Sequence, residues 1–137
     1  MEKILSVDAR ADARPDHFVQ RDGLRFAGTH LIVDLWHATN LDDVDVVDNA
    51  LRKAATAAGA TLLNIDLHRF TPNGGITGVA VLAESHISIH TWPECAYAAV
   101  DVFMCGEARP HKAVEVLRRV FSPETLTISE HRRGVMP

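Results

Sequence analysis

Residues 84–94 read Glu-Ser-His-Ile-Ser-Ile-His-Thr-Trp-Pro-Glu, and the rest of the chain is organised around this stretch. It places a candidate hydroxyl nucleophile, two imidazoles and two carboxylates within eleven residues. Its isoleucines, threonine and tryptophan favour a β-strand that begins at Glu84-Ser85. On a strand, His86 and His90 would lie about 13 Å apart, too far to share one metal ion. A helix would bring them together, but the β-branched residues argue against one. A polar edge strand with scattered histidines is the competing interpretation.

The bulk properties favour one globular domain in a reducing compartment. The chain has 137 residues, 47% of them hydrophobic and 23% charged, which is ordinary for a single domain. A net charge of −4 without a basic patch gives little support to nucleic-acid binding. No apolar run approaches the ~20 residues of a membrane span, and we expect no secretory signal and no membrane association. If residues 96–104 form one strand, Cys95 and Cys105 lie roughly 33 Å apart, so we expect free thiols and a cytoplasmic location.

Hydrophobic periodicity predicts a two-layer fold. Two helices are expected, one over residues 40–59, capped by Asn40 or Asp42 and ended by Gly59, and one that begins at Pro110 and ends before Ser122. The first 22 residues read as a loosely ordered polar arm, and residues 23–137 as a single domain. We therefore predict an α/β (α+β) two-layer sandwich, with a mainly antiparallel sheet and two helices on one face. The other face would be free for a second subunit. The expected strands are 30–36, 61–70 with Leu63, Ile65 and Leu67 on one face, 76–83, 84–92, 97–105 and 125–129, followed by a polar tail over 130–137.

Two segments carry a resemblance to a known family. Residues 82–94, Leu-Ala-Glu-Ser-His-Ile-Ser-Ile-His-Thr-Trp-Pro-Glu, and residues 97–106, Tyr-Ala-Ala-Val-Asp-Val-Phe-Met-Cys-Gly, closely resemble the prokaryotic S-adenosylmethionine decarboxylase proenzymes. The likeness extends from about Phe26 to about Gly134, and residues 1–22 look like an addition. The motif is long and carries rare residues at fixed offsets, so it is more specific than a short motif.

The resemblance implies self-cleavage between Glu84 and Ser85. Members of the family attack the preceding carbonyl with the serine hydroxyl and form an ester. His90 resembles the residue that removes the α-proton for elimination, and Thr77 stands where a serine commonly stabilises the oxyanion. Hydrolysis would leave a pyruvoyl group on residue 85 and two pieces, residues 1–84 and 85–137. A bend where two strands meet could supply the strain that a weak serine nucleophile needs.

The resemblance also implies roles in decarboxylation. The pyruvoyl ketone, the only cofactor expected, forms an imine (Schiff base) with the substrate amine and accepts the electrons left by CO₂. Cys105 matches the residue that returns a proton, although a small buried hydrophobe is its plainer interpretation. Glu94 matches a residue that binds the ribose hydroxyls, and could otherwise be a solvated loop carboxylate. Phe26 and Phe70 resemble aromatic residues of the substrate site, with core packing as the alternative.

We therefore expect a pyruvoyl-dependent S-adenosylmethionine decarboxylase that serves spermidine synthesis, as a homodimer of processed protomers with sites near the interface. No metal is expected. Arginine or ornithine decarboxylases on the same scaffold are the alternative, because Ser85, His90 and Cys105 would serve them equally. A binding module with an inactive motif and a metal hydrolase that uses some of the eight histidines are two further alternatives.

Overall fold

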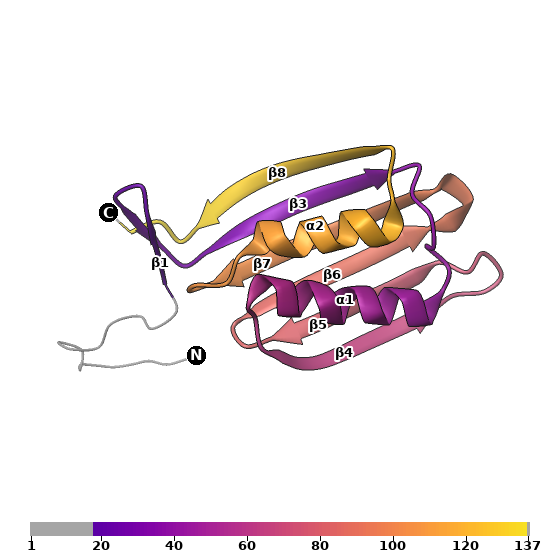
Figure 1. The fold of residues 1–137 in the computed structure, drawn as a ribbon, viewed down its shortest axis with the longest axis horizontal. Coiled ribbons are helices and arrows are strands. Elements are labelled where there is room, and N and C mark those ends of the chain that lie inside the picture. The colour runs from indigo at the N-terminus through magenta and orange to yellow at the C-terminus, as the bar shows by residue number, and fades with distance from the viewer. Residues whose placement is uncertain (1–17, 137) are drawn as a thin grey trace.

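Residues 18–136 are described by a computed structural model, and most of them form one sheet with two helices on one face (Figure 1). The six strands of this sheet run in the order β4-β5-β6-β7-β3-β8, and each pairs antiparallel with its neighbours. The predicted two-layer architecture is confirmed. The elements are β1 (Val19–Arg21), β2 (Leu24–Phe26), β3 (Gly28–Trp36), α1 (Val44–Ala58), β4 (Leu62–Arg69), β5 (Ile76–Leu82), β6 (Ser85–Trp92), the 3₁₀ turn η1 (Pro93–Cys95), β7 (Tyr97–Cys105), α2 (Pro110–Phe121) and β8 (Thr125–Arg133).

The two sheet faces differ in exposure because side chains alternate along a strand. On β6 one set of residues is buried beneath the helices, while the alternate set, from His86 to Trp92, faces the open side. The helices complete the buried layer with apolar stripes: α1 contributes Val47 and Leu51, and α2 contributes Leu117 and Phe121. This arrangement leaves one whole face of the sheet uncovered by the described residues, as Figure 1 shows.

Helix α1 begins later than predicted. Its N-cap is Asp43, whose Oδ1 accepts from the backbone N–H groups of Asp45 and Val46 at 3.0 and 3.2 Å. The expectation that Asn40 or Asp42 caps the helix is therefore wrong, because Asp43 alone satisfies two N–H groups of the first turn. The predicted end is confirmed, since Gly59 has the left-handed φ of 77°.

Two sequence-based boundaries and one side-chain orientation are corrected. Residues 19–21 are not part of a loose arm, because β1 pairs with β2 as a short hairpin; residues 1–17 lie outside the described part. Residues 130–133 are not a tail, because β8 continues along the whole of β3. Leu63 does not share a face with Ile65 and Leu67, because a register irregularity near residue 63 leaves it 62% exposed. Residues 130–133 of the edge strand β8 are mostly exposed and are held mainly by backbone hydrogen bonds to β3, so they show no apolar period.

The β5–β6 hairpin turns within two residues. Leu82 pairs with Ser85, and Ala83 and Glu84 form the turn between them. Glu84 has a φ of 59°, in the left-handed region that glycine and asparagine usually occupy. The expected bend between two strands is therefore present immediately before Ser85.

Candidate functional site

Ser85 and Cys105 lie together at one end of the sheet. The Ser85 Oγ accepts a hydrogen bond from the backbone N–H of Cys105 at 3.1 Å, and Ser85 is 9% exposed. The contact forms because β6 begins beside the end of β7. With Glu84 in the adjoining turn, these residues and Gly28 are here called the Ser85 cluster.

Gly28 leaves the space in which the thiol sits. It pairs directly with Cys105 across the β3–β7 ladder. A Cβ at residue 28 would lie 3.1 Å from the Cys105 Sγ and 2.6 Å from the Met104 carbonyl oxygen. Sequence reasoning missed Gly28, because the strand register that places it against Cys105 is not visible in one sequence.

The Cys105 thiol is held in its neutral form. Burial raises its pKa, the Glu84 carboxylate raises it further by like-charge repulsion of the thiolate, and a hydrogen bond with Ser85 opposes these effects only in part. A neutral thiol is a proton donor, whereas a nucleophilic cysteine needs a lowered pKa. The environment therefore suits the role that the resemblance implies.

Thr77 and His90 form a second group at the other end of β6. They face each other across the β5–β6 ladder, with 3.1 Å between the Thr77 Oγ1 and the His90 Nδ1. A hollow of about 300 Å³ opens beside them, and its wall includes Phe70 and Glu94. Thr77, His90, Phe70 and Glu94 are here called the His90 cluster. The full lining is Phe70, Thr71, Asn73, Gly75, Ile76, Thr77, His90, Thr91, Trp92 and Glu94.

The Ser85 and His90 clusters do not meet within one chain. Ser85 and His90 are the first and sixth residues of the same strand, so their Cα atoms lie roughly 16 Å apart at the usual strand rise. Their side chains also point to opposite faces, because Ser85 follows the buried set and His90 the open set. Within one chain, the predicted site residues therefore form two separate groups, the Ser85 cluster and the His90 cluster, which are here called half-sites.

Phe26 does not fit the role of an adenine contact in this arrangement. Its side chain is 0% exposed, and the Arg132 guanidinium lies 5.1 Å from its ring centroid. A ring that is wholly buried offers no face to a ligand, so packing is the better interpretation. Phe70, in contrast, is 51% exposed at the mouth of the hollow.

Two general features of the described residues bear on other classes of protein. Between residues 18 and 136, no group of three or more His, Cys, Asp and Glu side chains is arranged to hold a metal ion. No helix in that part of the chain is long and apolar enough to cross a membrane.

Comparison with known proteins gives one consistent result. Residues 29–134 match the sequence profile of the S-adenosylmethionine decarboxylase family. An S-adenosylmethionine decarboxylase proenzyme from Thermomicrobium roseum is 44% identical over 114 residues, covering 82% of this chain and 98% of the relative. One from Methanococcus aeolicus is 47% identical over 116 residues, with the same coverage. The crystal structure of the adenosylmethionine decarboxylase from Aquifex aeolicus superposes with a TM-score of 0.76 at 33% identity, covering 82% of this chain and 94% of that one. This chain belongs to the S-adenosylmethionine decarboxylase family.

Proposed function

We propose that the chain is a proenzyme that cleaves itself before Ser85 and then decarboxylates S-adenosylmethionine, supplying the aminopropyl donor for spermidine synthesis. The observation that carries this proposal is the position of Ser85, directly after a strained two-residue turn and beside a neutral thiol. The names of the relatives favour S-adenosylmethionine over arginine or ornithine as the substrate. Two free thiols, Cys95 and Cys105, favour a reducing compartment, and we place the enzyme in the cytoplasm on that basis.

The residues around the scissile bond suit an N-to-O acyl shift. The Ser85 hydroxyl follows directly on the Glu84 carbonyl that it must attack, and the left-handed backbone of Glu84 stores strain that the new ester can release. Elimination then requires a base at the Ser85 α-proton. His90 of the same chain cannot be that base, because its Cα lies roughly 16 Å from that of Ser85 along the strand.

A second copy of the chain resolves this separation. The open sheet face carries four apolar side chains that are 40–42% exposed, namely Ile32, Trp36, Val81 and Trp92. A two-fold axis through this face would set the strands of one copy against those of the other in reverse, so that the end of the sheet that carries the Glu84–Ser85 bond meets the His90 cluster of the partner. Cys105, which belongs to the partly exposed set of β7, faces the same side. We therefore propose a homodimer with two equivalent sites, each built from both copies.

The residues of the chain have distinct roles in decarboxylation. When formed, the pyruvoyl group at residue 85 supplies the electron sink for the departing carboxylate. Cys105, kept neutral by burial and by Glu84, returns a proton to the substrate carbon. Phe70 presents an exposed ring to the sulfonium cation, which gains about 0.5–2 kcal/mol from an aromatic face. Glu94, on the wall of the same hollow, accepts hydrogen bonds from the ribose hydroxyls.

Mass spectrometry of the purified protein tests the first step. The expected products are pieces of 84 and 53 residues, the second blocked by a ketone at residue 85. An intact chain, or a free amino group at the new terminus, contradicts the proposal. Release of CO₂ from S-adenosylmethionine, arginine and ornithine, assayed side by side, tests the substrate.

Mixed subunits test the shared site. Ser85→Ala and His90→Ala should each fail to process alone. After co-expression, the mixed dimer holds one site with both native residues, so the His90→Ala chain should be cleaved. If His90→Ala cleaves itself when expressed alone, or if no cleavage follows mixing although a dimer forms, the shared site is wrong.

A further inference from the structure

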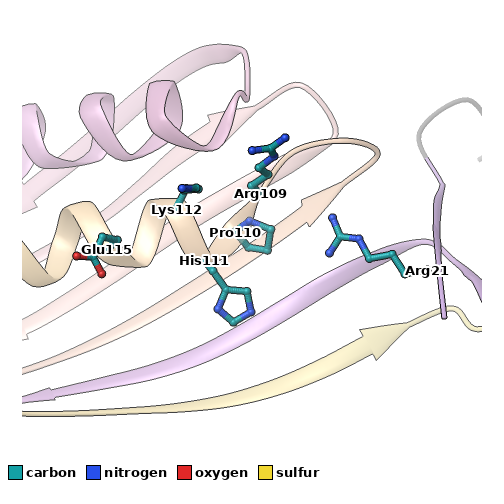
Figure 2. A pocket seen from close by; sticks show the side chains of 6 residues that line it. All are labelled: Arg21, Arg109, Pro110, His111, Lys112 and Glu115. Carbon is teal, nitrogen blue, oxygen red and sulfur yellow. The ribbon is translucent and has the colours of Figure 1, made fainter.

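A cavity of about 510 Å³ lies at the start of α2, apart from both half-sites (Figure 2). Arg21 reaches toward it from the β1–β2 hairpin, and the other lining residues belong to the first turns of α2 or directly precede it. An adjoining hollow of about 460 Å³ shares Arg21 and Arg109 and extends to Gly106, the residue after Cys105. The cavity itself is lined by Arg21, Arg109, Pro110, His111, Lys112 and Glu115.

The cavity holds an excess of positive charge. Glu115, its one carboxylate, is already paired with Arg118 and Arg119 on the outer side of α2. His111 is paired with Glu130 of β8 at 3.0 Å.

The other three cations of the cavity have no partner in the part of the chain that the structure describes. Within residues 18–136, the side chains of Arg21, Arg109 and Lys112 have no hydrogen bond or ion pair to a protein group. Three unneutralised cations around one cavity are unexpected in a chain whose net charge is −4.

The backbone adds to the positive potential. The N-cap residue Arg109 makes no side-chain capping bond, and Pro110 occupies the first helical position. The N-terminal end of a helix carries a partial positive charge. In α2 this charge comes from the aligned peptide dipoles, because Pro110 has no N–H and the N–H of Lys112 donates to the Arg109 carbonyl oxygen at 3.1 Å. This end of α2 therefore points the same sign of charge toward the cavity as the three side chains do.

We propose that this cavity binds a multiply charged phosphate anion, either a free polyphosphate or the phosphate chain of a nucleotide. Arginine guanidinium groups match phosphate oxygens with paired hydrogen bonds, and lysine adds a point charge. Three cations balance a di- or trianion better than a single carboxylate. The volume exceeds the need of one phosphate and admits pyrophosphate. The bound anion ties the β1–β2 hairpin to the first turn of α2 and restrains the segment from Gly106 to Lys112.

Titration calorimetry of the full-length chain at constant ionic strength tests the site. Pyrophosphate should bind with 1:1 stoichiometry per chain, and potassium chloride should give no saturable heat. ATP serves as the second arm. Binding of ATP equal to that of pyrophosphate assigns the site to the phosphates alone, and tighter binding of ATP assigns it to a nucleotide.

A matched pair of variants locates the binding. Arg109→Gln with Lys112→Gln removes two cations from the cavity and should weaken pyrophosphate at least about tenfold, since each lost charge-assisted hydrogen bond is worth that order. Arg52→Gln with Lys53→Gln removes the same charge from the exposed side of α1 and should change binding less than twofold.

Two further measurements separate this site from the proposed active site. Ser85→Ala should bind pyrophosphate as the native chain does, because the cavity does not include the processing residues. Hydrogen exchange at residues 106–112 should slow when pyrophosphate is added. Equal weakening in both double variants, no saturable heat with pyrophosphate or ATP, or unchanged exchange over these residues would overturn the proposal, whether or not the chain processes itself.

Discussion

Replacement of Glu84 by glycine tests whether backbone strain drives self-cleavage. Glu84 holds a φ of 59° immediately before the scissile bond. This conformation costs a residue with a Cβ roughly 1–2 kcal/mol, and glycine almost nothing. If about 1 kcal/mol of that strain is released as the ester forms, Glu84→Gly raises the barrier by the same amount. Cleavage should then be about fivefold slower. The assay follows conversion of the refolded 15.0 kDa chain into its two pieces on a gel.

Two control variants separate strain from other effects. Glu84→Gln keeps the strained backbone but removes the charge, so it should cleave at nearly the native rate. His37→Gly relieves a similar φ of 55° at an exposed position away from the cleavage site, and should leave cleavage unchanged. If Glu84→Gly cleaves as fast as Glu84→Gln, the turn contributes no strain energy and the reasoning fails.

Three other predictions concern the residues around the two half-sites. Thr77→Val removes the hydroxyl that lies 3.1 Å from the His90 Nδ1 and should slow processing about tenfold or more, whereas Thr77→Ser should not; time-resolved gels measure both. Cys105→Ala should still process but lose about 10²-fold or more in decarboxylation, measured as CO₂ release. Because the acid form of the thiol is active and its pKa is raised, native decarboxylation should fall as pH rises only beyond the pKa of an ordinary cysteine; a fall that begins near neutrality contradicts this assignment. Gly28→Ala forces a Cβ to within 2.6 Å of the Met104 carbonyl oxygen and should destabilise the fold by about 1–3 kcal/mol while lowering decarboxylation more than processing, which thermal unfolding and CO₂ assays detect together.

The apolar pattern was enough to predict the layers of the fold. The stripe on α1 and the alternation along β6 follow directly from burial of one face, and Gly59 ends α1 as its backbone requires. Strands that bury few side chains were either not predicted or predicted too short. β1 and the second half of β8 are held by ladder hydrogen bonds and bury few side chains, Val19 being buried in β1, so they leave no period in the sequence.

The candidate site could be predicted from the sequence only in part. The resemblance identified Ser85, His90 and Cys105, and the register then brought Cys105 to Ser85 while leaving His90 at the far end of the same strand. Spacing along one strand predicts this separation, and the proposed second copy is what would bring the two distant residues to one site. Gly28 escaped detection because its role depends on a cross-strand neighbour 77 positions away, and a single sequence does not specify register.

The strand order determines whether the two pieces would stay together after the proposed cleavage. A cut between residues 84 and 85 assigns β3, β4 and β5 to the first fragment, and β6, β7 and β8 to the second. In the sheet, β3 lies between β7 and β8, and β5 lies beside β6. Strands of the two fragments therefore pair with each other at three places. Neither piece can leave without unravelling the sheet. Severing the backbone therefore creates a new chain end for chemistry while the two polypeptides remain interlocked as one body.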